Sequence, residues 1–198
     1  AHMVNAYYNP QKNLIVFPAA ILQAPFYDLH QSSSANYGGI GAVIAHEISH
    51  AFDTNGASFD ENGSLKDWWT ESDYAAFKEK TQKVIDQFDG QESYGAKING
   101  KLTVSENVAD LGGIAAALEA AKRDPNFSAE EFFHNFARIW RMKGRPELIK
   151  LMASVDVHAP AKLRVNVQVP NFDDFFTTYD VKEGDGMWRS PEDRVIIW

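Results

Sequence analysis

The chain has 198 residues, 44% hydrophobic and 23% charged, which fits one globular domain and excludes a disordered or low-complexity protein. It has no Cys, so a disulfide framework, a thiolate zinc finger, an iron–sulfur cluster and a cysteine nucleophile are excluded. A net charge of −8 and no apolar run near the roughly 20 residues of a membrane span argue against nucleic acid and a membrane as partners.

The predicted elements begin after residues 1–3, which are typical of a cloning remnant, so the predicted domain covers residues 4–198. A short β-branched and aromatic run at residues 14–17 predicts a strand that ends at Pro18. Residues 37–52 have apolar residues throughout and little charge, which predicts a helix buried on most sides.

Further elements follow in the second half of the chain. Residues 70–88 begin at a plausible N-cap and predict a helix, and residues 128–131 have capping-box spacing before another. Pro146 suits the first position of a short helix. Alternating valines predict a second strand at residues 164–169. The fold class is therefore expected to be mainly α with a small β-sheet (α+β).

The motif His46-Glu47-Ile48-Ser49-His50 lies in the predicted buried helix. Side chains four residues apart share one face of a helix, so the two imidazoles can converge on a single Zn²⁺ per chain. Glu47 then projects toward the open coordination position, where it can take a proton from zinc-bound water. The alternative is a pair of core histidines with Glu47 as their ion-pair partner, and we favour the zinc site.

A hydrolytic zinc site usually has three protein ligands, and Glu106 is the candidate for the third. Glu106 and Asp110 share one face of an otherwise apolar stretch, which is costly unless something positive compensates the two carboxylates. Zinc bound by Glu106, with Asp110 accepting an N–H from a zinc-bound His, would compensate them. The alternative is an acidic pair placed at a helix N-terminus by the helix dipole.

Asp156 and His158 precede Ala159-Pro160, which predicts a rigid, non-helical segment. Asp156 could orient the imidazole so that His158 donates to a developing oxyanion, and Arg164 could donate to a substrate carbonyl. On spacing alone, ordinary surface residues are an equal alternative.

Several strings of residues are shared with one known family. They lie at residues 4–10, 15–19, 36–41, 46–50, 67–69, 106–110, 135–137 with Trp140, and 156–158. Through them nearly the whole chain resembles the catalytic C-terminal part of the neprilysin family of zinc endopeptidases. The resemblance implies a zincin fold of the thermolysin-like, gluzincin type. The missing cysteines suit a bacterial, PepO-like member and favour a cytoplasmic location.

The resemblance also implies roles in catalysis. The zinc ligands would be His46, His50 and Glu106, with Glu47 as the catalytic base. His158 would stabilise the tetrahedral intermediate together with zinc. Three carboxylates would orient these groups: Asp110 for His46, Asp53 for His50 and Asp156 for His158.

The implied substrates are oligopeptides. Asn5 and Ala6 would pair with the peptide backbone in strand fashion, and Arg164 would hold a backbone carbonyl. An apolar pocket would favour a bulky apolar residue after the scissile bond. Its lining would be Ile21, Phe26, Val43, Ile139 and Trp140.

Members of this family carry a long N-terminal portion with a helical domain that covers the site. We expect this chain to lack that portion, and therefore to fold and bind zinc but to have weak or no peptidase activity. The apolar surface that the portion would cover should favour self-association. Two other functions stay open: a non-catalytic zincin-like module that binds zinc or peptide, and a helical interaction domain with a coincidental motif.

Overall fold

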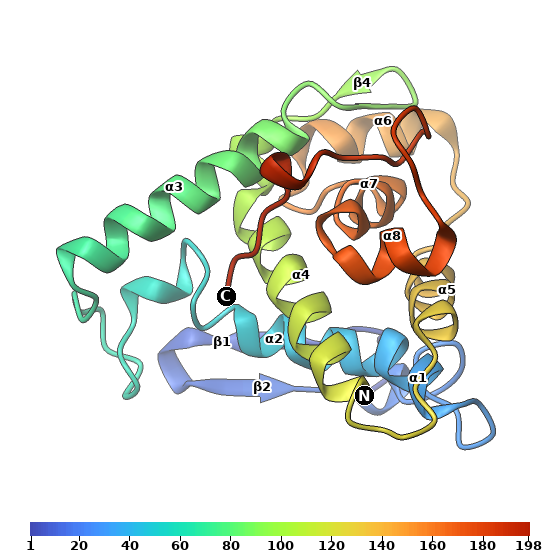
Figure 1. The fold of residues 1–198 in the computed structure, drawn as a ribbon. Helices are drawn as coiled ribbons and strands as arrows, with labels where there is room; N and C mark the ends of the chain where they lie inside the picture. Colours follow the sequence, from blue (N-terminus) through green and yellow to red (C-terminus); the bar gives the residue numbers. More distant parts are fainter.

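Two helices cross at the centre of the molecule, α2 (Ala42–Ser49) and α4 (Gly100–Ala121) (Figure 1). The computed structural model describes residues 1–198. The helices approach closely at Gly113, where a Cβ atom would lie 2.8 Å from the His46 backbone nitrogen. Only glycine leaves room for that approach, so its position fixes how the acidic side chains of α4 face the histidines of α2.

The entry into α2 is continuous helix. The short helix α1 (Ser33–Asn36) and a π-helical segment (Tyr37–Gly41) lead directly into α2. The predicted helix is confirmed in place, although its α-helical part ends at Ser49. One of its faces is exposed, whereas the sequence predicts burial on most sides. Ile44 and Ile48 are 37% and 50% exposed, and because they are four residues apart they share that open face.

Two small antiparallel hairpins make up the β structure. In the first, β1 (Tyr7–Asn9) pairs with β2 (Leu14–Val16), which confirms the predicted strand at residues 14–17. In the second, β3 (Glu92–Ser93) pairs with β4 (Ala96–Lys97). The first hairpin lies alongside α2 (Figure 1), and its start contributes to the site described below.

Helices α3 (Glu71–Phe88) and α5 (Ala129–Ile139) pack around this centre. Thr70 caps α3 in a complete capping box with Asp73, as its sequence predicts. The capping box predicted at Ser128 is only half formed. The Ser128 side chain accepts from the Glu131 N–H, but the Ser128 backbone N–H donates to Ser34 Oγ instead of the Glu131 side chain. The helix forms nonetheless, because one satisfied N-cap suffices.

The last helices are α6 (Pro146–Val155), α7 (Ala161–Asn166) and α8 (Asp173–Tyr179). Pro146 begins α6 as predicted. The strand predicted at residues 164–169 is wrong, because this stretch is helix α7 followed by a 3-10 turn. Leu163 and Val167 are buried four residues apart, so packing at helical spacing overrides the β propensity of the valines.

The hydrophobic core lies on both sides of α4. Val108 and Leu111 belong to a cluster shared with α3 and the C-terminal segment, whereas Ile114 and Leu118 belong to a cluster shared with α5 and α8. None of the helices combines the length and the hydropathy that a membrane-spanning helix requires. The mainly α fold with small sheets agrees with the predicted class.

Candidate active site

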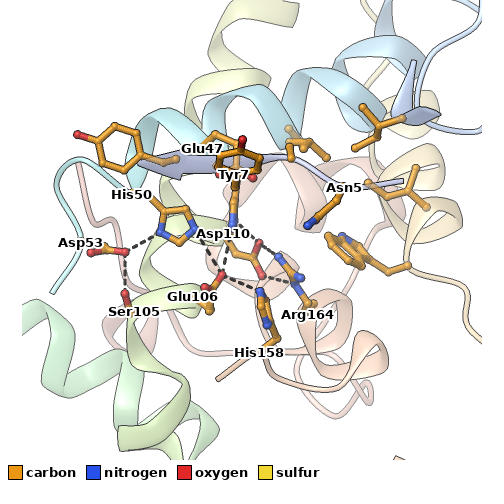
Figure 2. Close-up of a pocket in the computed structure, with 18 of the residues that line it drawn as sticks. Asn5, Tyr7, Glu47, His50, Asp53, Ser105, Glu106, Asp110, His158 and Arg164 are labelled. Carbon is orange, nitrogen blue, oxygen red and sulfur yellow. Dashed lines mark hydrogen bonds and ion pairs between the residues drawn. The ribbon is translucent and has the colours of Figure 1, made fainter. Parts of the chain in front are cut away.

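The two histidines of the H-E-x-x-H motif converge on one carboxylate of α4 (Figure 2). His46 Nε2 lies 3.3 Å and His50 Nε2 lies 3.5 Å from Glu106 Oε2. The motif's own three ligand atoms, from His46, Glu47 and His50, all lie within 4.8 Å of one another. The predicted zinc ligands are therefore brought to one point from α2 and α4.

The second nitrogen of each imidazole is held by a buried carboxylate. His46 Nδ1 lies 2.9 Å from Asp110 Oδ1, and His50 Nδ1 lies 2.6 Å from Asp53 Oδ2. An ionised carboxylate only accepts, so Nδ1 carries the proton in both rings. Each Nε2 of a neutral ring then presents its lone pair to Glu106, which is how zinc-binding histidines are oriented.

This arrangement fits a zinc ion. Glu106 Oε2 is buried, and although both Nε2 atoms lie close to it, neither contact has the alignment of a good hydrogen bond. Lone pairs and an anionic oxygen that face one another repel unless a cation lies among them. Two ligands at ~2.0–2.1 Å from a tetrahedral zinc lie about 3.4 Å apart, close to the separations observed.

The charges around this point favour a cation. Burial alone would lower the pKa of His50, but its contacts with Asp53 and Glu106 raise it to about 10. Burial would raise the pKa of Glu106, but His46 and His50 hold it well below its usual range. The cluster therefore attracts positive charge, either as protons on the imidazoles or as a metal ion that replaces them.

The carboxylate of Asp53 ties the end of α2 to α4. Its Oδ1 accepts from the backbone N–H groups of Asn55 and Gly56, both at 2.7 Å. Its Oδ2 accepts from Ser105 Oγ at 2.6 Å, and Ser105 Oγ accepts from Asn55 Nδ2 at 3.0 Å. Sequence reasoning missed Ser105 and Asn55, because no local pattern links residues so far apart in the chain.

Arg164 holds Asp110, the partner of His46. Its Nε and Nη2 donate to the two carboxylate oxygens of Asp110 at 2.8 and 2.6 Å. Its guanidinium lies 3.7 Å from the ring centroid of Trp140, and its Nη1 makes no hydrogen bond within the protein. Arg164 lies on α7 rather than on the predicted strand, and sequence reasoning missed its pairing with Asp110.

His158 approaches the same carboxylate from the segment between α6 and α7. Its Nε2 lies 3.3 Å from Glu106 Oε2. Asp156 Oδ1 accepts from both the backbone N–H and Nδ1 of His158, at 2.9 and 2.8 Å. Asp156 therefore orients His158 in this non-helical segment, in the geometry that the sequence predicts.

A pocket of about 540 Å³ joins these groups. Of the predicted site residues, only Asp156 is not part of its wall, and it contacts His158, which is. The apolar part of the wall contains all five residues predicted for it, namely Ile21, Phe26, Val43, Ile139 and Trp140. Asn5 and Ala6 line the pocket just before β1, together with Tyr7 and Tyr8, which sequence reasoning did not select (Figure 2).

Comparison with known proteins identifies the family. The model of peptidase family M13 matches residues 5–195. Neutral endopeptidase of Lactococcus lactis subsp. lactis is 60% identical over 198 residues, which are 100% of this chain and 32% of that protein. The crystal structure of PepO from Lactobacillus rhamnosis matches with a TM-score of 0.96 and 49% identity, covering 100% of this chain and 31% of that chain.

A zinc metalloprotease of Mycobacterium tuberculosis, solved with an inhibitor, matches with a TM-score of 0.93 and 41% identity, covering 97% of this chain and 32% of that chain. The chain thus spans about a third of the length of these proteins. With the family match running almost from end to end and the fold shared with PepO, the chain belongs to peptidase family M13, as its resemblance to the neprilysin zinc endopeptidases predicts.

Proposed function

We propose that this chain carries a zinc-dependent endopeptidase active site that hydrolyses peptide bonds of oligopeptides. The observation that carries the proposal is the convergence of His46 Nε2 and His50 Nε2 on Glu106 Oε2, with Glu47 beside them. Relatives named as a neutral endopeptidase and a zinc metalloprotease support it. One zinc ion per chain, held by His46, His50 and Glu106, is part of the proposal.

Glu47 is the proposed catalytic base. Zinc bound here would supply a Lewis acid that polarises the substrate carbonyl and lowers the pKa of water. Glu47 is 5% exposed, and its Oε2 has no hydrogen-bond partner within the protein. Burial raises the pKa of Glu47. A carboxylate with a raised pKa is suited to take a proton from the attacking water and return it to the leaving amine near neutral pH.

His158 and Arg164 are the proposed donors to substrate oxygens. His158 Nδ1 lies against Asp156, so its Nε2 faces the proposed zinc site, where an N–H would donate to the oxyanion of the tetrahedral intermediate. Arg164 uses Nε and Nη2 on Asp110, so its Nη1 is available for a backbone carbonyl of the peptide. Both roles follow from donors that the fold holds in place before substrate arrives.

The walls of the pocket suggest how a peptide is held. Its apolar part suits a bulky apolar side chain on the residue after the scissile bond. Asn5 and Ala6 lie where the chain enters the two-stranded hairpin, so an extended peptide can add to this segment through main-chain hydrogen bonds. Oligopeptides with an apolar residue at that position are therefore the proposed substrates.

Glu47→Gln tests this function in the longest form of the protein that its gene encodes. We expect at least about 10²-fold loss of kcat on a quenched fluorescent peptide with Phe after the scissile bond, with one zinc per chain retained by elemental analysis. Glu79→Gln, an exposed position on α3, is the matched control and should keep full activity. Full activity of Glu47→Gln would contradict the proposal.

The competing function is a non-catalytic zincin-like module that binds zinc or peptide. It predicts bound zinc, binding of the same peptide and no cleavage even by the unsubstituted protein. The partnerless Oε2 of Glu47, buried beside the two histidines, favours the catalytic function, because a module that only binds zinc has no use for it.

A further inference from the structure

A second pocket shares only Trp140 with the proposed active site. Its volume is about 600 Å³, which falls within the roughly 300–1,000 Å³ typical of small-molecule sites. It lies at the C-terminal end of α5, between the start of α7 and the tip of the β3–β4 hairpin. None of the roles assigned above uses this space.

The polar wall of this pocket is cationic. Arg138, Arg141 and Lys162 line it, none of the three pairs with a carboxylate, and no Asp or Glu is part of the wall. The chain has a net charge of −8, yet residues 134–166 contain seven Lys and Arg and only two Asp and Glu. Three of these seven cations line the pocket, so its wall carries unpaired positive charge in an otherwise acidic protein, and this charge attracts anions.

Two buried hydrogen-bonding groups in the same wall lack partners. Ser93 is 4% exposed and its hydroxyl makes no hydrogen bond, and the indole Nε1 of Trp140 is buried and equally unpaired. Buried polar groups are nearly always hydrogen-bonded, since an unpaired donor forfeits its hydration. An anion in the pocket would supply countercharge to the three cations and would bring an acceptor close to Ser93 and Trp140.

The rest of the wall is mainly apolar, with His134 and Asn166 as further polar residues. Met142, Ile149 and Val165 belong to it, so a ligand that fills the pocket must bury an apolar body next to its charged group. We propose that this pocket binds a small organic anion, a carboxylate or phosphate joined to an apolar body. That anion is either a free small molecule or an acidic side chain of a peptide. The site requires neither zinc nor peptidase activity.

The indole N–H of Trp140 provides a direct readout. The longest form of the protein that its gene encodes, labelled with ¹⁵N-tryptophan, is titrated with phenyl phosphate, and Trp140→Phe assigns the resonance. We expect a saturable shift of the Trp140 signal, and no shift with benzyl alcohol, which has the apolar body without the charge. The peptides acetyl-Phe-Glu-amide and acetyl-Phe-Gln-amide form the second arm: a shift with the Glu peptide alone identifies a peptide side chain as the source.

Substitution of the cations localises the binding. Arg138→Gln, Arg141→Gln and Lys162→Gln should each weaken phenyl phosphate about two- to fivefold, as expected for exposed charges, and the triple variant at least about tenfold. Ser93→Ala should weaken it with the cations intact. Lys83→Gln, an exposed position on α3, is the control and should bind as the unsubstituted protein does.

Two results would overturn the proposal. Equal affinity in the triple variant would show that the shift arises from ligand in the neighbouring active-site pocket, which Trp140 also lines. The absence of a saturable shift with both phenyl phosphate and the Glu peptide would show that the pocket does not bind such anions. The cations would then serve only to stabilise the C-terminal end of α5, where positive charge complements the helix dipole.

Discussion

The pairing of Arg164 with Asp110 leads to a quantitative prediction. Arg164→Met removes both charge-assisted hydrogen bonds from a carboxylate that is 4% exposed. Burial would raise the pKa of Asp110, but Arg164 and His46 hold it at about 2. Relative to an unperturbed pKa of ~3.9, this depression of the pKa is worth about 2–3 kcal/mol of stability at neutral pH, shared between the two partners.

The stability lost in Arg164→Met should exceed the contribution of Arg164 to the pKa shift of Asp110, because the substitution leaves an uncompensated buried charge. Breaking a buried ion pair in this way costs about 3–5 kcal/mol. The stability that ionised Asp110 contributes is present above pH ~4, its pKa in the unfolded chain, and is lost as the pH falls through its folded pKa near 2. The measurement is therefore urea denaturation of the zinc-free protein at pH 7.

Asp110→Asn keeps an acceptor for His46 and removes the charge, which allows a double-mutant cycle. We expect a coupling energy of at least about 2 kcal/mol between Asp110→Asn and Arg164→Met. Arg123→Met, an exposed arginine without a salt bridge, is the control and should change stability by less than about 0.5 kcal/mol. A loss below about 1 kcal/mol for Arg164→Met, or strict additivity in the cycle, would refute the reasoning.

Three further predictions concern the site and its support. Ser105→Ala should weaken zinc binding about tenfold in a chelator competition, because Asp53 loses a hydrogen bond. The exposed control Ser154→Ala should leave the zinc affinity unchanged, and equal affinities of the two variants would count against a role of the Ser105–Asp53 hydrogen bond. Gly113→Ala should lower the free energy of unfolding by about 1–3 kcal/mol in urea denaturation, since its Cβ would press on α2. Gly186→Ala has open space and should be tolerated, and an unchanged stability of Gly113→Ala would contradict the close approach of the two helices. Chelation of zinc should lower the melting temperature, with recovery on adding one equivalent of zinc, and an unchanged temperature would argue against ligation at this site.

Much of the site could be predicted from sequence because its parts are local. The spacing of His46 and His50, and that of Glu106 and Asp110, each places two side chains on one face of a helix whatever the rest of the chain does. The segment from Asp156 to His158 is local as well, and the structure shows the expected contact between their side chains. The assigned roles of these residues in catalysis stay predictions until the substitutions above are measured.

Other features could not be predicted because distant residues decide them. The valines at residues 164–169 favour a strand by propensity, but burial of Leu163 and Val167 at helical spacing produces α7 instead. At Ser128, the N–H that would complete a capping box is taken by Ser34. In both cases a tertiary contact overrides a preference that a short window of sequence expresses correctly.

The sequence by itself determined which side chains could serve as zinc ligands and base, since helical periodicity and residue chemistry are properties of short segments. Only the tertiary structure decided how these segments face one another. The close approach at Gly113 sets α4 against α2, and hydrogen bonds then join Asp110 to Arg164 and Asp53 to Ser105. Such pairings depend on where the whole chain excludes water, because a buried charge persists only where the fold supplies its partner.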